Sequence, residues 1–278
     1  MVWLITGISS GLGKALAEAL LQKGDFLVGT FRNPAQTLAF NEQHQGKAFA
    51  VTMDIANPAQ IQAAWAEIEQ KIGLIDVLVN NAGAGFVGAV EEASIDEMRR
   101  VFDINVFGTM LLTKLALPML RKQGKGHILQ ISSHGGIKAF AGFGVYNASK
   151  FALEGFSEAL AQEIAPFGVK LSIIEPGPFR TNFAGNSLLE AAQTLDMYDT
   201  TAGAFRKRMK EVVHGNQEGS PEKAATVILE VVEQSVNTGV APLRVPLGKV
   251  ALATIGAKLE SVQQDLEAGR EQALRAVY

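Results

Sequence analysis

The stretch "VWLITGISSGLG", residues 2–13, joins a short apolar run to a turn that is rich in glycine. An apolar run of this length is typical of a buried strand, and the pattern that follows, through Lys23, is typical of an amphipathic helix. Glycines let the backbone turn sharply and let a pyrophosphate approach the helix N-terminus, where unpaired N–H groups favour anions. The stretch therefore predicts the first strand, turn and helix of a nucleotide-binding fold. Its spacing, G-x-x-x-G-x-G, differs from the usual fingerprint G-x-G-x-x-G, and similar turns also occur without a ligand.

The alternation of apolar runs with helical patterns continues along the chain. Continuous apolar strands that are each followed by a helix indicate a parallel sheet with right-handed crossovers. We therefore predict an α/β fold of the Rossmann type, a doubly wound parallel sheet, in a single domain of 278 residues. The predicted strands lie at 2–6, 26–31, 48–54, 76–83, 126–133 and 169–177, and the helices between them include 57–72, 94–122 and 146–165.

The alternation breaks after the sixth of these strands. Residues 182–218 predict a long, partly helical insertion, which we expect to act as a mobile lid over a substrate. A helix restarts at 220–234, with Ser220 as its N-cap. A short strand near 243–247 and a C-terminal helical extension, 247–278, complete the predicted chain.

The composition excludes several classes of function. A net charge of −3 predicts no general attraction to nucleic acid. The absence of cysteine excludes disulfides, thiolate metal sites and cysteine nucleophiles, and four scattered histidines form no recognisable metal cluster, so we expect no metal. The first apolar run begins at residue 2 with no charged region before it, and no apolar run reaches the ~20 residues that a membrane span needs. The sequence thus predicts a cytoplasmic protein that does not span a membrane.

One pair of side chains in "YNASK", residues 146–150, suggests acid–base chemistry. Tyr146 and Lys150 are four residues apart, so on a helix they lie on one face. A positive charge beside a phenol favours the phenolate. Shifting the pKa of a phenol from about 10 to neutrality takes about 4 kcal/mol, and a lysine ~4 Å away at an effective dielectric of about 20 supplies that order of energy. The alternative is an ordinary pair of surface side chains.

Four motifs occur in a fixed order: "TGISSGLG" (6–13), "NNAG" (80–83), "SS" (132–133) and "YNASK". With these motifs the chain resembles the short-chain dehydrogenase/reductase family. The later stretches "YDTTAGAFRKRM" and "LRVPLGKVALATI" resemble bacterial members related to 17β-hydroxysteroid dehydrogenases. The resemblance implies hydride transfer with a nicotinamide cofactor between an alcohol and a carbonyl compound.

The resemblance also implies a catalytic tetrad of Asn105, Ser133, Tyr146 and Lys150. Tyr146 would protonate the developing oxyanion, Ser133 would donate a hydrogen bond to it, and Lys150 would also hydrogen-bond the nicotinamide ribose. Asn105, in "DINVFG", would hold a water that links Lys150 to solvent. The structural alternatives are a capping serine at a strand end and an amide that satisfies a helix kink.

The predicted cofactor is NADP(H), in preference to NAD(H). An acid at the end of the second strand would bind the adenosine ribose and repel a 2′-phosphate, but here Phe31 stands there and Arg32 follows. Arginine suits a phosphate because its donors are planar and bidentate, although a solvent-facing arginine is the alternative. The residues expected to contact the cofactor are Gly7, Ser9, Ser10, Gly11, Leu12, Gly13, Arg32, Asp54, Ile55, Asn81, Ala82, Gly83, Tyr146, Lys150, Pro176, Gly177, Phe179 and Thr181.

The loops after the strands concentrate aromatic residues, which predicts an apolar ketone or secondary alcohol as the substrate. The roles of His134 and of the basic run 206–210 stay open. The apolar helix 101–120, together with 151–160, predicts the helical face of a homodimer or homotetramer, as in relatives. The residues expected to contact the substrate are Phe86, Ser133, Phe140, Phe143, Phe183 and Tyr198.

Two other functions share parts of this pattern. A non-catalytic dinucleotide sensor on the same fold has no need of the tyrosine and lysine, and this chain keeps both. Sugar epimerases and dehydratases share the Y-x-x-x-K pair, but they usually have a different glycine spacing and a larger C-terminal domain.

Overall fold

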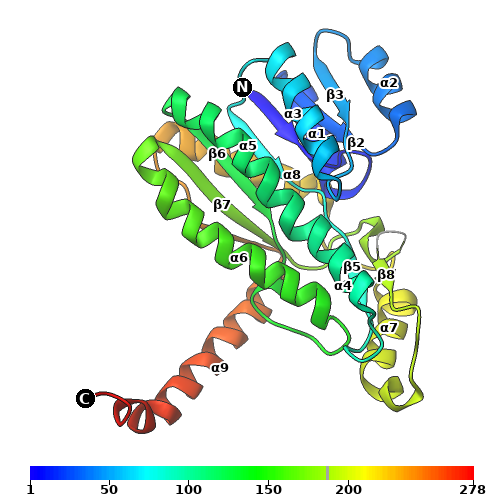
Figure 1. Cartoon of the computed structure of the whole chain (residues 1–278), viewed down its shortest axis with the longest axis vertical. Coiled ribbons are helices and arrows are strands. Elements are labelled where there is room, and N and C mark those ends of the chain that lie inside the picture. The colour runs from blue at the N-terminus through cyan, green and yellow to red at the C-terminus, as the bar shows by residue number, and fades with distance from the viewer. Residues whose placement is uncertain (186–187) are drawn as a thin grey trace.

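Seven parallel strands form the central sheet in a computed structural model that describes residues 1–185 and 188–278. The strands lie in the order β3-β2-β1-β4-β6-β7-β9 (Figure 1). This order confirms the predicted doubly wound Rossmann-type sheet. Every residue of β2 and β6 except the first is buried, as expected for strands covered on both faces. The bounds are Val2–Ile5 (β1), Phe26–Phe31 (β2), Ala48–Thr52 (β3), Val77–Asn80 (β4), Gly126–Ile131 (β6), Val169–Pro176 (β7) and Arg244–Leu247 (β9).

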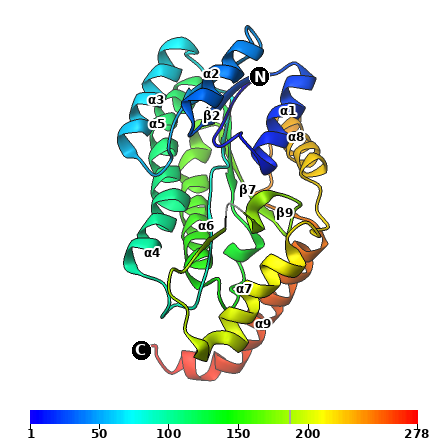
Figure 2. The same cartoon turned by 90° about the vertical axis from the view of Figure 1, so that its right-hand side faces the viewer.

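Helices cover both faces of the sheet, and each face has its own hydrophobic core (Figure 2). On one face α1 (Gly11–Lys23) packs against α8 (Pro221–Thr238), with Leu20 and Ile228 fully buried. On the other face lie α3 (Pro58–Lys71), α5 (Gly108–Gln123) and α6 (Gly144–Ile164). A further helix, α2 (Pro34–Gln43), follows β2 and begins at the cap Asn33, whose side chain accepts from the Ala35 N–H at 2.9 Å.

The predicted helix at 94–122 consists of three parts. It comprises α4 (Ile95–Phe102), a π-helical turn (Asp103–Phe107) and α5. Ile95–Gln123 is also the one helical stretch, among the described residues, that is long and apolar enough to cross a membrane, which the sequence prediction did not anticipate. Half of its most apolar window is buried inside the protein, so packing against the sheet and α3 accounts for that apolar character.

A small sheet that the sequence analysis did not predict joins the segment after β4 to the insertion after β7. In it β5 (Gly85–Val87) pairs in parallel with β8 (Leu188–Glu190). The insertion continues through α7 (Ala204–Arg208), which π-helical turns flank, and positions 186 and 187 within it lie outside the described residues. The last element, α9 (Lys249–Leu274), extends from the end of β9 away from the sheet (Figure 1).

Candidate active site

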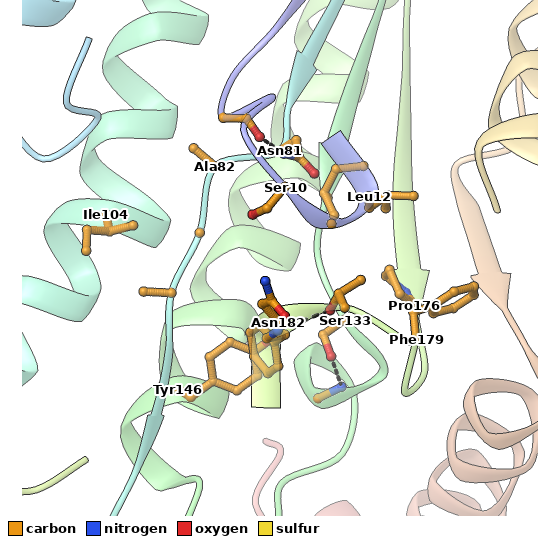
Figure 3. Close-up of a pocket in the computed structure, with 18 of the residues that line it drawn as sticks. Ser10, Leu12, Asn81, Ala82, Ile104, Ser133, Tyr146, Pro176, Phe179 and Asn182 are labelled. Atoms are coloured by element: carbon orange, nitrogen blue, oxygen red, sulfur yellow. Dashed lines mark hydrogen bonds between the residues drawn. The ribbon is translucent and has the colours of Figure 1, made fainter. Parts of the chain in front are cut away.

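A cavity of about 890 Å³ lies at the carboxyl ends of the strands, where ligands bind in open α/β sheets. The turn between β1 and α1 borders it, together with the ends of β2, β4, β6 and β7 and the start of α6. Figure 3 shows Ser10 of the glycine turn, Ser133 after β6 and Tyr146 of α6 around this space. Asn81, Ala82 and Gly83 also line it, so the fold brings all four sequence motifs to one place.

The conformation of the glycine turn depends on its own backbone angles and on hydrogen bonds from Asn81. Gly7 and Gly11 have positive φ angles, 71° and 60°, which favour glycine. The side-chain amide of Asn81 donates to the carbonyl oxygens of Thr6 at 2.8 Å and of Gly7 at 3.1 Å. A Cβ at Gly13 would lie 2.3 Å from Asn81 Nδ2, so Gly13 is required for packing.

The N-terminus of α1 fits an anionic group. Its N-cap, Ser10, makes no side-chain capping bond, and its first turn contains no acidic residue. The N–H groups of this turn are therefore free to face a phosphate at the cavity. Gly13 does not line the cavity, and its contact with the cofactor stays a prediction. The other residues predicted to contact the cofactor all line it: Gly7, Ser9, Ser10, Gly11, Leu12, Arg32, Asp54, Ile55, Asn81, Ala82, Gly83, Tyr146, Lys150, Pro176, Gly177, Phe179 and Thr181.

Three members of the predicted tetrad, Ser133, Tyr146 and Lys150, line the cavity and are almost fully buried. Lys150 Nζ donates to the carbonyl oxygen of Ile131 at 2.9 Å and lies 5.9 Å from the centre of the Tyr146 ring. Ser133 Oγ accepts from the Gly135 N–H at 3.0 Å, which leaves its own hydroxyl proton free to donate. The helical face predicted for Tyr146 and Lys150 is thus turned inward, and they are not a surface pair.

Burial changes the ionisation of this pair in a way that the sequence prediction missed. It raises the pKa of Tyr146 to about 12, with the neighbouring Ser133 hydroxyl acting in the opposite direction. It lowers the pKa of Lys150 to about 8, while the negative charge of Glu154 acts in the opposite direction. In the protein without ligands, desolvation of the phenolate therefore holds Tyr146 protonated at neutral pH.

The fourth member, Asn105, lies beside the cavity without lining it. It stands in the π-helical turn, where its Oδ1 accepts from the Ala84 N–H at 2.8 Å. Its Nδ2 donates to the Ala84 carbonyl at 2.9 Å and to Ser149 Oγ at 3.0 Å. Asn105 therefore links the segment before β5 to α6, its side chain does not satisfy the backbone of the helix kink, and its role in a water relay stays a prediction.

Comparison with known proteins agrees with this geometry. The family model described as short chain dehydrogenase matches residues 1–191. An oxidoreductase of Botryotinia fuckeliana, BOA17, is 36% identical over 274 residues, which cover 98% of each chain. The 3-ketodihydrosphingosine reductase of Bacteroides thetaiotaomicron is 36% identical over 86% of this chain and 87% of its own length. A solved short-chain dehydrogenase from Streptomyces avermitilis is 38% identical, covers 99% of both chains and superposes with a TM-score of 0.90.

This chain belongs to the short-chain dehydrogenase family. It is an oxidoreductase of that family, whose members among the relatives are named as reductases and dehydrogenases. Solved short-chain dehydrogenase structures with the same fold include a complex with NAD, and a serine dehydrogenase with this fold was solved with NADP⁺. The closer resemblance to members related to 17β-hydroxysteroid dehydrogenases stays a prediction.

The part of the cavity next to Tyr146 is aromatic in this short-chain dehydrogenase. Phe140, Phe143 and Phe183 line the cavity as predicted, and the ring of Phe183 lies 5.5 Å from that of Tyr146. Two predicted substrate residues do not line it. Phe86 is 1% exposed and belongs to the core beneath β5, and Tyr198 points its hydroxyl to Glu91 at 2.7 Å.

The sequence analysis missed lining residues from two distant segments of the short-chain dehydrogenase. Phe205 of α7 packs against Phe143 with the ring centres 4.6 Å apart, and the first two turns of α9 contribute Val250 and Thr254. The apolar spacing within 205–213 was a signal for the first segment. No local signal places α9, because its position depends on where β9 joins the sheet.

The two features left open by the sequence also find places. His134 lines the cavity, and burial holds the pKa of its imidazole below the ordinary value. In the basic run, Arg206 pairs with Glu92 at 2.7 Å and Lys210 with Glu190 at 2.7 Å. Arg208 lines the cavity, so the run is divided between anchoring the insertion and facing the site.

Proposed function

We propose that this protein is an NADP(H)-dependent oxidoreductase that interconverts an apolar ketone and a secondary alcohol, with Tyr146 as general acid and base. The observation that supports this most directly is that Tyr146, Ser133 and Lys150 line the same cavity as the glycine turn and Arg32. One cavity thus holds groups suited to a dinucleotide and groups suited to proton transfer.

The side chains divide the work by their hydrogen-bonding capacity. The nicotinamide, when bound, supplies or accepts the hydride. Tyr146, protonated at neutral pH, is ready to donate a proton to the substrate oxygen as negative charge develops there. Ser133 donates its free hydroxyl proton to the same oxygen. Lys150 uses one of its three N–H donors on Ile131, which leaves two for the ribose and for the phenol.

Arg32 supports the preference for NADP(H). It is exposed at the end of β2 and lines the cavity beside Ser10, while the neighbouring Phe31 is buried against Phe40. Asp54 is the only acid that lines the cavity among the described residues, and it lies at the end of β3, not of β2. A 2′-phosphate would therefore meet a guanidinium and no carboxylate at the end of β2.

The substrate class rests on the rings of Phe140, Phe143, Phe183 and Phe205, which surround the space next to Tyr146. Such a wall favours a substrate that is apolar around its carbonyl group. We further propose a cytoplasmic location and a homodimer or homotetramer formed through α5 and α6. Phe107, directly before α5, is 58% exposed, and Phe151 of α6 is 43% exposed.

The test is a panel of apolar ketones and alcohols, assayed with both cofactors by the absorbance of the reduced nicotinamide. We expect turnover with NADP(H) to exceed that with NAD(H), and Arg32→Ala to lower kcat/KM for NADP(H) about ten- to a hundredfold. Gln36→Ala, at a neighbouring uncharged cavity residue, is the matched control. A wild type that prefers NAD(H), or an Arg32→Ala variant that weakens both cofactors equally, would contradict the cofactor assignment. Absence of turnover with every substrate, despite cofactor binding, would favour a dinucleotide sensor.

A further inference from the structure

The C-terminal helix α9 extends away from the body of the protein (Figure 1). It has 26 residues and is therefore about 39 Å long. Ala251 is its only buried residue, and every described residue from Leu259 to the end of the helix is exposed except the half-buried Gly269. Most of α9 thus lacks the tertiary packing that normally stabilises a helix.

The exposed part of α9 carries one continuous apolar seam. Leu252, Ile255, Leu259, Val262 and Leu266 follow one another at alternating spacings of three and four residues. Leu252, Leu259 and Leu266 are 61%, 61% and 62% exposed. An apolar repeat with an average period of 3.5 residues is the pattern by which two helices pack as a coiled coil. The small residues Gly269 and Ala273 continue the same spacing.

We propose that α9 pairs antiparallel with α9 of a second copy of this chain. A parallel pair would place both protein bodies, which lie at the N-terminal end of α9, side by side at the same end of the pair. In the antiparallel pair the bodies lie at opposite ends. Leu259 then faces Val262 of the partner subunit, and Leu252 faces the small Gly269 of the partner subunit, so large and small residues alternate across the seam.

The charges beside the seam fit this arrangement. Lys258 and Asp265 flank it, and neither has an ionic partner within the part of the chain that the structure describes, whereas Arg270 is paired with Glu267. In the antiparallel register Lys258 lies beside Asp265 of the partner subunit, and symmetry produces this pair twice. In a parallel pair Lys258 would instead face the partner's Gln263.

The same charges do not suit a membrane surface. The helix carries three basic and four acidic residues, so its net charge is negative. Helices that lie on anionic membranes are rich in lysine and arginine on their polar face. A second copy of α9, with matched apolar and charged positions, fits this seam better. The pairing is separate from the proposed interface on α5 and α6 and does not depend on the proposed function.

The first test is the molar mass of the full chain, measured by sedimentation. We expect Leu259→Gln/Leu266→Gln to have half the mass of the wild type at the same concentration, with unchanged thermal unfolding. The control Ala257→Gln/Glu271→Gln places the same residue on the opposite, exposed face of α9 and should keep the wild-type mass. Equal masses for the wild type and the leucine variant would overturn the proposal.

Two further variants test the orientation. Lys258→Glu should weaken the association, and Lys258→Glu/Asp265→Lys should restore it, because the swapped charges again meet in the antiparallel pair.

The chain has no cysteine, so an introduced thiol can be followed without background. A mixture of Leu259→Cys and Val262→Cys proteins should form mixed disulfides in preference to either homodimer. If disulfides form instead between two Leu259→Cys chains, in preference to the mixed disulfides, the pair is parallel and the proposal is overturned. The proposal would also be overturned, in favour of a membrane surface, by the following result: the wild type binds neutral or anionic vesicles, the leucine variant does not, and the two proteins have the same molar mass.

Discussion

At the scale of single residues, burial determines what Tyr146 can do. Its pKa of about 12 keeps the phenol protonated, which suits proton donation to a ketone. Tyr146→Phe should therefore lower kcat by about a hundredfold or more while leaving cofactor affinity nearly unchanged. Steady-state rates and a cofactor titration by fluorescence check this. Tyr198→Phe, whose hydroxyl contacts Glu91 outside the cavity, is the control. A Tyr146→Phe variant that keeps most of its activity would exclude Tyr146 as the acid.

Glu154 influences Lys150 from one turn further along α6. Burial lowers the pKa of Lys150, the negative charge of the buried Glu154 carboxylate opposes this, and the resulting pKa is about 8. Replacing it by glutamine removes that negative charge, so the pKa of Lys150 should fall and the lysine should lose its proton at lower pH. If a charged lysine is needed, the alkaline limb of kcat/KM should move to lower pH in Glu154→Gln.

The matched control for this shift is Glu158→Gln. Glu158 also contacts Arg244, but it is 49% exposed and does not act on Lys150. Its pH profile should stay like that of the wild type. An unchanged alkaline limb in Glu154→Gln would show that Lys150 ionisation does not limit the rate.

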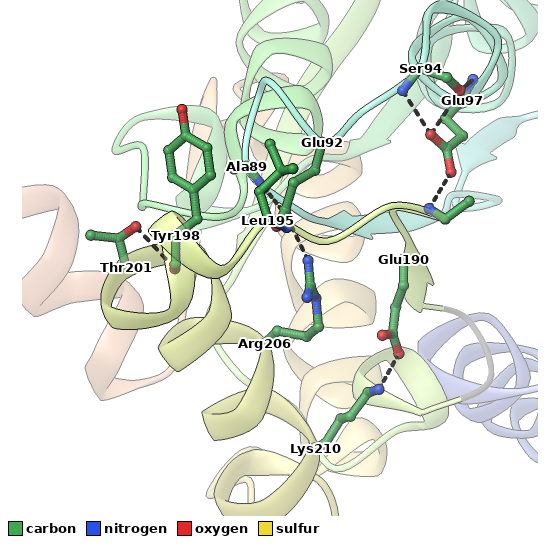
Figure 4. A network of polar contacts seen from close by, with 11 residues as sticks. Ala89, Glu92, Ser94, Glu97, Glu190, Leu195, Tyr198, Thr201, Arg206 and Lys210 are labelled. Carbon is green, nitrogen blue, oxygen red and sulfur yellow. Dashed lines mark hydrogen bonds and ion pairs between the residues drawn. The ribbon is translucent and has the colours of Figure 1, made fainter.

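At the scale of elements, one carboxylate fastens the insertion to the body of the protein (Figure 4). Glu92 is 4% exposed and accepts from the N–H groups of Ala89 at 2.8 Å and Leu195 at 2.9 Å, and from Arg206 at 2.7 Å. Although burial would raise the pKa of Glu92, these donors hold it below the ordinary value. The predicted lid thus has a fixed end near Leu195, and its mobility stays a prediction.

Glu92→Gln should loosen this end of the insertion, because an amide has one acceptor oxygen and cannot balance the buried charge of Arg206. We expect faster hydrogen exchange at Leu195 and a higher KM for the substrate, since Phe205 of the same segment lines the cavity. Hydrogen-exchange mass spectrometry with and without cofactor measures this. The exposed Asp96, whose one ionic contact among the described residues is with Arg99 of its own helix, should leave exchange at Leu195 unaltered when it is changed to asparagine. Equal exchange in both variants would show that Glu92 is not the anchor.

At the scale of the whole molecule, a buried charge cluster joins the last strand to the rest of the sheet. Arg244 of β9 pairs with Glu175 of β7 at 2.6 Å, and also with Glu154 and Glu158 of α6. Glu175 is fully buried and Glu154 is 4% exposed. The guanidinium is the only cation within ionic contact of Glu175 among the described residues. Removing it leaves Glu175 buried without a counter-ion and Glu154 with only the charge of Lys150 nearby.

Arg244→Ala should therefore lower the free energy of unfolding by about 3–5 kcal/mol. Burial already raises the pKa of Glu154 and Glu175, and loss of Arg244 would raise both further. A carboxyl group whose pKa is higher in the folded state stabilises that state as the pH falls, so the loss should be smaller near pH ~5 than near pH ~8. Urea unfolding at both pH values measures this, with the exposed Arg275→Ala as control. A loss that does not vary with pH would contradict the role of the carboxylates.

Local sequence signals determined most of the fold and the position of the site. The glycine turn, the continuous apolar strands and the Tyr146–Lys150 spacing each depend on residues close together in the chain, so the doubly wound sheet and the cavity at its strand ends follow from them. Only the tertiary structure decided features that depend on distant segments. These are the pairing of β5 with β8, the position of Phe205 and Thr254 in the cavity wall, and the position of Phe86 in the core instead of the cavity. The tertiary structure also decided that Tyr146 is a protonated phenol. The packed chain excludes water from the phenol, and this desolvation, and not the spacing to Lys150, raises its pKa.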